Sequence, residues 1–433
     1  MCRARSRVHP RGGVTVKRAV VAAAVLLAAL IPAIVSTPFT ATAAGASPRD
    51  AVRDREYWLD DYGIRDAWAV TRGAGVTIAI IDTGVARGVP DLAGAVVGGT
   101  DFSGHGSPDG QTPVGNESPH HGTMVASLAA GRGTGGNSGV IGAAPAASIL
   151  SISIGVGDGI DDSDQQVADA VVWAVDHGAD VINMSFTRNE IDWPESWDDA
   201  FLYAAEHDVV IVAAAGNRGS GTQQVGAPAT MPGVLTVAGV DRAGVVSDDA
   251  SSQGITIAVA APSESLVGVR PDGRYVTWAG TSGAAPIVAG IVALVRAAHP
   301  ELDAANVINR VIATARDAGP PGDDFSYGYG YVDAFAAVST TVPEVAENPM
   351  GDLAEWIRIY RRADAPEQPV VVVVPELEPV PEGEFSDPTD VLLPRMVTLQ
   401  LVGGPLLAIV ILALVAGALV VAVVRRIRPS RSR

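Results

Sequence analysis

The chain contains almost none of the residues needed for disulfide or thiol chemistry. Of its 433 residues one is cysteine, Cys2, which lies in an N-terminal leader that we expect to be removed. The remaining chain then has neither a disulfide nor a thiol nucleophile. Its stability must come from core burial, which about 300 residues can supply. The net charge of −18 argues against nucleic-acid binding.

Acidic residues are absent from the N-terminal end of the chain. Residues 1–18 carry only positive charge, an apolar run follows at 19–35, and small residues surround Ala43 and Ala44. This order is typical of a secretory signal peptide, which we assign to residues 1–44. Because the apolar run is slightly long, an uncleaved signal anchor is the alternative.

The C-terminal end also lacks acidic residues. Residues 396–424 contain an uncharged stretch long enough to span a bilayer, and the arginine-rich tail 425–433 follows directly. Positive charge stays on the cytoplasmic side of a membrane. We therefore predict a single-pass cell-membrane protein with a transmembrane helix at 396–424, a cytoplasmic C-terminus and an extracytoplasmic body.

The body between these ends has the pattern of an α/β fold. Apolar runs such as GVTIAIID (75–82) and DVVIVAAAGN (208–217) alternate with helix-like stretches over residues 45–338. Continuous apolar strands alternating with helices are typical of a mainly parallel sheet covered on both faces, which makes three layers. Functional residues then belong at the carboxyl ends of the strands.

Residues 339–395 are mostly acidic and rich in proline. Repeated prolines favour an extended spacer, so we predict a stalk between the body and the membrane. Two pieces leave alternatives open. The sequence GDLAEWIRIYRR (351–362) fits one short helix, and Val370–Val374 fits an added strand.

The stretch TWAGTSGAAPIVAG (277–290) surrounds Ser282 with small residues. Such residues let backbones approach closely, and a serine where a turn enters a helix lies among unpaired N–H groups. That environment suits a nucleophile whose product carries a developing negative oxygen. Taken alone, the stretch fits a packed turn equally well.

Three other segments supply the partners that a serine nucleophile needs. Asp82 ends a buried strand, His121 begins a small-residue helix, and Asn217 ends another strand. A histidine can take the serine proton, a carboxylate can orient the imidazole, and an amide can stabilise the oxyanion. Together with Ser282 they predict a site for nucleophilic acyl transfer.

The motifs DTG, HGTxVA, AAAGN and GTSxAAP, in this order, resemble those of the subtilisin-like serine proteases. The resemblance covers roughly Trp58 to Val338 and implies a subtilisin-like fold with endopeptidase activity on proteins or peptides. It makes Asp82 the orienting acid, His121 the general base and acid, Ser282 the nucleophile and Asn217 the oxyanion donor. It also implies a set of substrate-binding residues: Ser185, Phe186, Thr187, Ala214, Ala215, Gly216 and, at the floor of the primary specificity pocket, Gly226.

The order of signal peptide, short N-terminal extension, protease body, stalk and C-terminal helix resembles the mycosins. These are membrane-anchored subtilases associated with type VII secretion, so the resemblance implies secretion-complex subunits as partners. The cysteines of their disulfides are absent from this chain. The alternative function is a subtilase-fold structural component of a membrane secretion complex, with incidental or lost catalysis.

No cofactor is predicted from the sequence. The acidic loop 155–164 lacks the spacing of an EF-hand and fits a solvated turn better. The loop 135–145 resembles the calcium loop of the family but is one residue shorter. Calcium is therefore not supported by a clear motif.

Two departures from the family pattern suggest restricted access to the cleft. Thr187 and Arg188 stand where the family often has two glycines. Before the body there is room for only a short N-terminal extension, from about residue 45 to residue 61, and not for a large pro-domain. We hypothesise that this extension or these two side chains gate the cleft. Ordinary loop surface is the alternative.

Overall fold

A computed structural model describes residues 50–116, 118–155, 163–361 and 403–427. The chain divides into two compact units, residues 1–362 and residues 363–433. Three features predicted from the sequence lie outside the described residues: the signal peptide (1–44), the stalk beyond residue 361 with Val370–Val374, and the last part of the basic tail.

The first unit is built on a seven-stranded sheet in which every neighbouring pair is parallel. The strands follow the order β2-β3-β1-β4-β5-β6-β7. Their bounds are β1 Thr77–Asp82, β2 Val96–Asp101, β3 Ser148–Ser153, β4 Val181–Met184, β5 Val210–Ala214, β6 Leu235–Val240 and β7 Ile257–Pro262. Strands β4 to β7 are buried along their whole length, as expected for strands covered on both faces. The predicted parallel sheet is confirmed.

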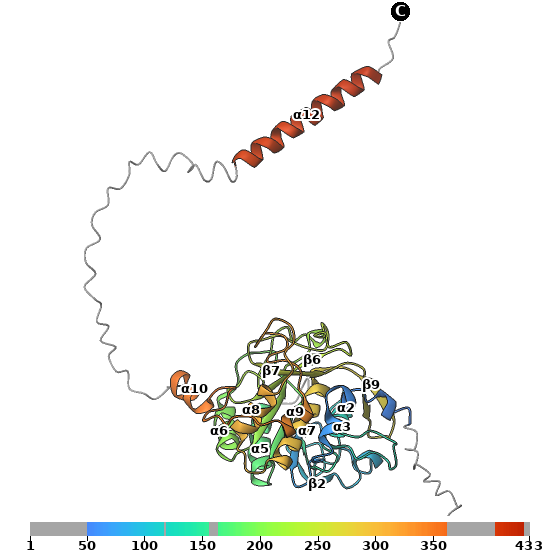
Figure 1. Ribbon diagram of the computed structural model, residues 1–433, viewed down its shortest axis with the longest axis vertical. Helices are drawn as coiled ribbons and strands as arrows, with labels where there is room; N and C mark the ends of the chain where they lie inside the picture. The colour runs from blue at the N-terminus through green and yellow to red at the C-terminus, as the bar shows by residue number, and fades with distance from the viewer. Residues whose placement is uncertain (1–49, 117, 156–162, 362–402, 428–433) are drawn as a thin grey trace, which may run out of the picture. The chain divides into compact units, whose positions relative to one another are not determined.

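Helices cover both faces of this sheet (Figure 1). Helices α4 (His121–Ala130) and α7 (Thr281–Ala298) pack together on one face, and α5 (Ser163–Asp176) and α6 (Glu195–Glu206) pack together on the other. The remaining elements are η1 Arg53–Arg55, α2 Trp58–Asp61, α3 Ile64–Ala67, η2 Pro90–Leu92, η3 Arg218–Ser220, β8 Leu266–Val269, β9 Tyr275–Trp278, α8 Ala304–Ala313 and α9 Ala334–Ser339. The three-layer α/β architecture is confirmed.

Helices α4 and α7 approach each other closely because small residues line their contact. A Cβ atom placed on Gly290 would lie 2.6 Å from the Cβ of Ala143 and 2.8 Å from the carbonyl oxygen of Ala129 in α4. Only a residue without a side chain fits there, since real Cβ contacts do not fall below about 3 Å. The small-residue pattern predicted around Ser282 therefore serves helix packing as well as the turn.

The boundary predicted at Val338 is wrong, because the body continues through a C-terminal extension formed by residues 340–361. This extension includes α10 (Leu353–Tyr360), which confirms the predicted short helix. The ring of Trp356 lies 4.4 Å from that of Trp193, and Arg361 Nε lies 2.9 Å from the Asp198 carboxylate. The extension is thus held by aromatic packing and an ion pair, although its composition resembles that of a spacer.

The second unit contains one described helix, α12 (Gly404–Ile427). Its segment Gly404–Ala422 has a mean hydropathy of 2.9 and no buried residue, and it is long enough to cross a membrane. Helix α7 passes the same test of length and composition, but 78% of it is buried inside the body. Of these two described helices, α12 is therefore the one whose apolar side chains are not covered by the protein. A membrane would provide the apolar environment that they lack.

We expect Gly290→Ala to lower the free energy of unfolding of the body by about 1–3 kcal/mol, the usual cost of overpacking. On an exposed helix the same change stabilises by about 1 kcal/mol, so the sign of the effect reports the close packing. The measurement is urea unfolding followed by tryptophan fluorescence, because all seven tryptophans lie in the first unit. An unchanged or raised midpoint would contradict the close α4–α7 contact.

Candidate active site

Asp82 and His121 form a hydrogen-bonded pair at the carboxyl end of β1. Strand β1 ends at Asp82, and α4 begins at His121. The imidazole Nδ1 lies 2.9 Å from each carboxylate oxygen, and the Thr83 N–H donates to Oδ1 at 2.7 Å. A Cβ on Gly122 would lie 2.5 Å from the Gly84 carbonyl oxygen, so this glycine lets α4 begin close to β1. The carboxylate thus fixes the tautomer and the orientation of the ring.

The charge on Asp82 changes the basicity of His121. Burial of the imidazole lowers its pKa, but the charge and hydrogen bond of the Asp82 carboxylate outweigh that effect and leave the pKa above its ordinary value of 6.5. Asp82 is 1% exposed, whereas a quarter of the His121 side chain remains accessible. The ring is therefore a base whose opposite edge is available to a reactant.

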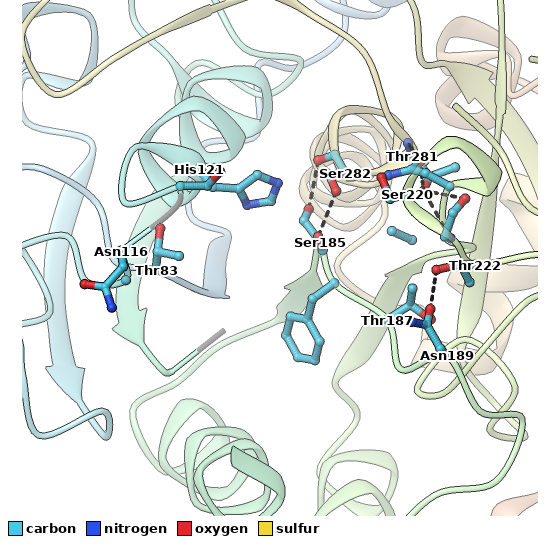
Figure 2. A pocket seen from close by; sticks show the side chains of 16 residues that line it. Thr83, Asn116, His121, Ser185, Thr187, Asn189, Ser220, Thr222, Thr281 and Ser282 are labelled. Atoms are coloured by element: carbon cyan, nitrogen blue, oxygen red, sulfur yellow. Dashed lines mark hydrogen bonds between the residues drawn. The ribbon is translucent and has the colours of Figure 1, made fainter. Parts of the chain in front are cut away.

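Ser282 is the second residue of α7 and lies beside Ser185. The Ser282 hydroxyl donates to the Ser185 carbonyl oxygen, and the Ser185 hydroxyl donates to the Ser282 carbonyl oxygen, both at 2.9 Å. Figure 2 shows the His121 ring to one side of Ser282, with Ser185 below Ser282 and joined to it by these two hydrogen bonds. Within the described residues no hydrogen bond joins Ser282 to His121. The serine must rotate away from Ser185 before the imidazole can take its proton.

Asn217 follows β5 and has a fixed amide orientation. Its Oδ1 accepts the backbone N–H of Thr281 at 2.8 Å and the Thr281 hydroxyl at 3.0 Å. Since a backbone N–H can pair only with the oxygen, the Nδ2 donor must face the opposite way. No acceptor among the described residues takes its hydrogens. Asn217 therefore presents an unused donor next to the start of α7.

These side chains border one cavity of about 450 Å³. Its lining contains five of the seven predicted substrate-binding residues, namely Ser185, Phe186, Thr187, Ala214 and Gly216, with His121, Asn217 and Ser282. Ala215 does not line the cavity, because it is fully buried and its N–H bonds to Val237 in the sheet.

Gly226 is not among the residues that line the cavity, and its predicted place at the floor of the primary specificity pocket stays a prediction. A Cβ on Gly226 would lie 1.9 Å from the Arg188 carbonyl oxygen and 2.8 Å from Thr187 Oγ1. The space beside this glycine is therefore filled by the segment after β4. Gly226 allows that segment to approach, so it lies directly behind Thr187.

The structure adds residues at the site that sequence patterns missed: two that line the cavity and one that packs against His121. Thr222 and Asn189 close one end of the cavity through a 2.6 Å hydrogen bond from the threonine hydroxyl to the asparagine oxygen. Trp278 packs edge-on to His121, with ring centroids 5.9 Å apart. Of these, only Trp278 carried a usable signal, since it stands four residues before Ser282.

The gating hypothesis is not supported for two of its three elements. The Arg188 side chain turns away from the cavity and pairs with Asp164 and Glu190. Among the described residues of the N-terminal extension, 50–61, none lines the cavity. Thr187 alone remains at the cleft.

The residues around the loop 135–145 do not fit a calcium ion. The Arg53 guanidinium already enters this loop, where Nη2 donates to the Ser138 carbonyl oxygen at 3.2 Å. The carboxylates nearby are used by backbone N–H groups: Glu56 accepts from Ile141 at 2.7 Å, and Asp91 accepts from Val140 at 2.6 Å. A protein cation thus occupies the loop that a metal ion would have to enter. The predicted solvated turn at 155–164 lies mostly outside the described residues.

The sequence profile of the Subtilase family matches residues 73–330, which contain the whole site described above. The chain belongs to the subtilase family. It is accordingly a serine endopeptidase of the subtilisin type, and subtilisin DY from Bacillus licheniformis is 36% identical over 274 residues, covering 61% of this chain and 92% of that protein. The match to fervidolysin from Fervidobacterium pennivorans, 34% identical, covers 66% of this chain but spans only 44% of fervidolysin.

Mycosins are among the relatives of this subtilase. Mycosin-3 from Mycobacterium tuberculosis is 35% identical over 336 residues, covering 64% of this chain and 70% of that protein. The crystal structure of MycP1 from Mycobacterium smegmatis superposes with a TM-score of 0.58 at 31% identity, covering 70% of this chain and 89% of that one. The predicted resemblance to mycosins is confirmed at the level of sequence and fold.

We expect Asp82→Asn to move the acid limb of the pH profile of kcat/KM to lower pH. The carboxylate raises the pKa of His121, and a base acts only when neutral, so removing that charge lets the imidazole stay neutral at lower pH. The value of kcat/KM should itself fall on the order of 10³–10⁴-fold, because the asparagine favours the wrong tautomer.

The matched control for this experiment is His120→Gln. His120 adjoins the pair, and burial lowers its pKa instead of raising it. Its removal should leave the limb in place. If the limb moved in His120→Gln and stayed in place in Asp82→Asn, the titrating group would be His120, and the assignment to His121 would be contradicted.

Proposed function

We propose that this subtilase is a membrane-anchored endopeptidase that cleaves peptide bonds through Asp82, His121 and Ser282. The observation that carries the proposal is that three chemical groups adjoin the same cavity. A base held by a buried carboxylate, a serine at a helix N-terminus and an unused amide donor all adjoin the same space. Acyl transfer needs these three functions within reach of one carbonyl group.

The reaction would proceed in two steps at Ser282. As substrate binds, the hydroxyl leaves the Ser185 carbonyl oxygen, gives its proton to His121, and attacks the scissile carbonyl carbon. The Asn217 Nδ2 and the Ser282 N–H would stabilise the oxyanion. His121 then protonates the leaving amine, which departs and leaves an acyl-enzyme on Ser282. In the second step water gives a proton to His121 and attacks the acyl carbon, and His121 returns the proton to the Ser282 oxygen as the acid product leaves. Asp82 holds the ring in place and stabilises the imidazolium.

We further propose that α12 anchors the enzyme, with the body outside the cell and the C-terminus in the cytoplasm. The proposal is supported by an apolar helix without buried residues and by the arginines that follow it. The relative MycP3 is described as a protease from the type VII (ESX-3) secretion system. By analogy, a secretion complex would supply the substrates and partners of this chain.

A structural role in such a complex is the second candidate function. It is favoured by the contact between Ser282 and the Ser185 carbonyl oxygen, which leaves the nucleophile unpaired with its base. The intact Asp82–His121 pair weighs against it, since a merely structural subtilase does not need a buried carboxylate aimed at an imidazole. The two candidates differ in whether Ser282 reacts.

Ser282→Ala should abolish covalent labelling by a fluorophosphonate probe and reduce peptide hydrolysis on the order of 10⁶-fold. The reason is that no other hydroxyl can combine attack with proton transfer to His121. Ser326→Ala, which removes a hydroxyl outside the cavity, is the matched control and should label like the wild type. Labelling of well-folded Ser282→Ala, or none of the wild type, would favour the structural role.

Truncation after Arg395 should move the protein from the membrane fraction to the soluble fraction and leave probe labelling intact. The expected separation follows from the two compact units, because the truncated chain keeps every described contact of the body. Fractionation of the secreting host followed by labelling is the measurement. A truncated chain that stays membrane-bound after signal cleavage would point to a second anchor.

A further inference from the structure

The positions of His121 and Ser282 define two sides of the cavity. Because His121 must protonate the leaving amine, the leaving part of a substrate lies on the His121 side of Ser282. The acyl part then extends to the opposite side, where Figure 2 shows Thr187, Asn189 and Thr222. This direction rests on the catalytic roles proposed above.

The acyl side of the cavity is a slot between two chain segments. Strands β4 and β5 are neighbours in the sheet, and residues at their carboxyl ends form the two walls: 185–187 after β4, and Ala214 and Gly216 at the end of β5. A residue bound through its carbonyl group at Ser282 must place its side chain between these walls. The width of the slot therefore decides which side chains fit.

The slot is narrow where Gly216 faces Thr187. Gly216 has a φ of +102° and no side chain, yet a Cβ built on it would lie 3.0 Å from Thr187 Cγ2 and 2.6 Å from Thr222 Cγ2. Two threonine methyl groups thus fill the space that the glycine leaves open. An aromatic ring cannot enter between these walls without moving one of them.

The threonine hydroxyls at this end are already paired within the protein. The Thr187 hydroxyl donates to the Arg188 carbonyl oxygen at 3.0 Å, and the Thr222 hydroxyl donates to Asn189 Oδ1 at 2.6 Å. Ser252 Oγ donates to the Thr222 carbonyl oxygen at 2.6 Å. The hydroxyls therefore offer no hydrogen to a substrate, and the methyl groups remain as the contact surface.

A charged side chain of a substrate would find no oppositely charged partner at this end of the cavity. The guanidinium of Arg188 is engaged with Asp164 and Glu190 outside the cavity. Within the described lining His121 is the single ionisable side chain, and it lies on the leaving side. A lysine or glutamate in the slot would lose its hydration without compensation.

We propose that the Thr187 methyl group is a specificity determinant that restricts the acyl-side residue of the substrate to a short, uncharged side chain of about the size of alanine. The Thr187 methyl group acts by filling part of the slot. The hydrogen bond from the Thr187 hydroxyl to the Arg188 carbonyl oxygen keeps the side chain in this rotamer. The substrate class is thus a peptide with a small residue immediately before the scissile bond.

The test compares chromogenic peptides that differ only in having alanine, leucine or phenylalanine before the scissile bond, with the full chain in detergent. The wild type should cleave the alanine peptide with a kcat/KM at least about tenfold above that of the phenylalanine peptide. Thr187→Ser keeps the hydroxyl and removes only the methyl, so it should shift this ratio about tenfold or more toward phenylalanine. Thr187→Val keeps a methyl in the slot and should retain the wild-type ratio.

Fluorophosphonate labelling separates this inference from the proposed function, because the probe carries no peptide side chain into the slot. A labelled wild type that prefers phenylalanine, or a labelled Thr187→Ser variant with the wild-type ratio, would overturn the inference and leave the catalytic proposal intact. A wild type that is not labelled would instead overturn the catalytic proposal and the inference that rests on it. Thr187→Ala provides a second enlarged slot, and its ratio should shift in the same direction.

Discussion

The close packing of α4 against α7 is the constraint on which the site depends. Each helix carries a residue of the site in its first turn, His121 on α4 and Ser282 on α7, so the separation of the two side chains follows from the separation of the helices. Gly290 permits that separation because it brings α7 onto the Ala129 carbonyl group. A wider contact would move the base away from the nucleophile without changing either residue. The glycines and alanines of this region therefore help to set the geometry of the proposed catalytic site, although they do not line the cavity.

The order of the strands supplies the rest of the site. In the sheet β1, β4 and β5 are neighbours, so their carboxyl ends bring together Asp82, Ser185 and Gly216 from distant parts of the sequence. Parallel strands place all such ends at one edge, and the helices that follow or precede them start there. A buried carboxylate, a substrate wall and a nucleophile can thus be assembled from short motifs, each of which is locally an ordinary strand end or helix start.

This assembly explains which parts could be predicted from the sequence. Asp82, His121, Asn217 and Ser282 stand at element ends inside recognisable motifs, so their grouping followed from the fold and the resemblance together. The end of the slot could not be predicted in this way, because the Thr222–Asn189 bond depends on side chains brought together by two irregular loops. The C-terminal extension was assigned to a stalk for a similar reason. Its proline-rich composition favours a spacer, whereas Trp356 finds a partner in Trp193 only in the folded body.

Two titrating groups give the body opposite responses to pH. Burial raises the pKa of Glu56 to about 8, while the Ile141 N–H and the Arg53 charge oppose this shift only in part. The folded state therefore binds more protons than the unfolded state between pH 4.5 and about 8, so the attachment of the N-terminal extension loses stability as pH rises through that window. In the proposed mechanism His121 imposes the reverse trend on catalysis, since its raised pKa means that the neutral imidazole accumulates only as pH rises. The attachment of the N-terminal extension through Glu56 is thus most stable at lower pH, whereas the His121 imidazole is neutral only at higher pH. Glu56 therefore sets the upper limit, and His121 the lower limit, of the pH range in which both conditions hold.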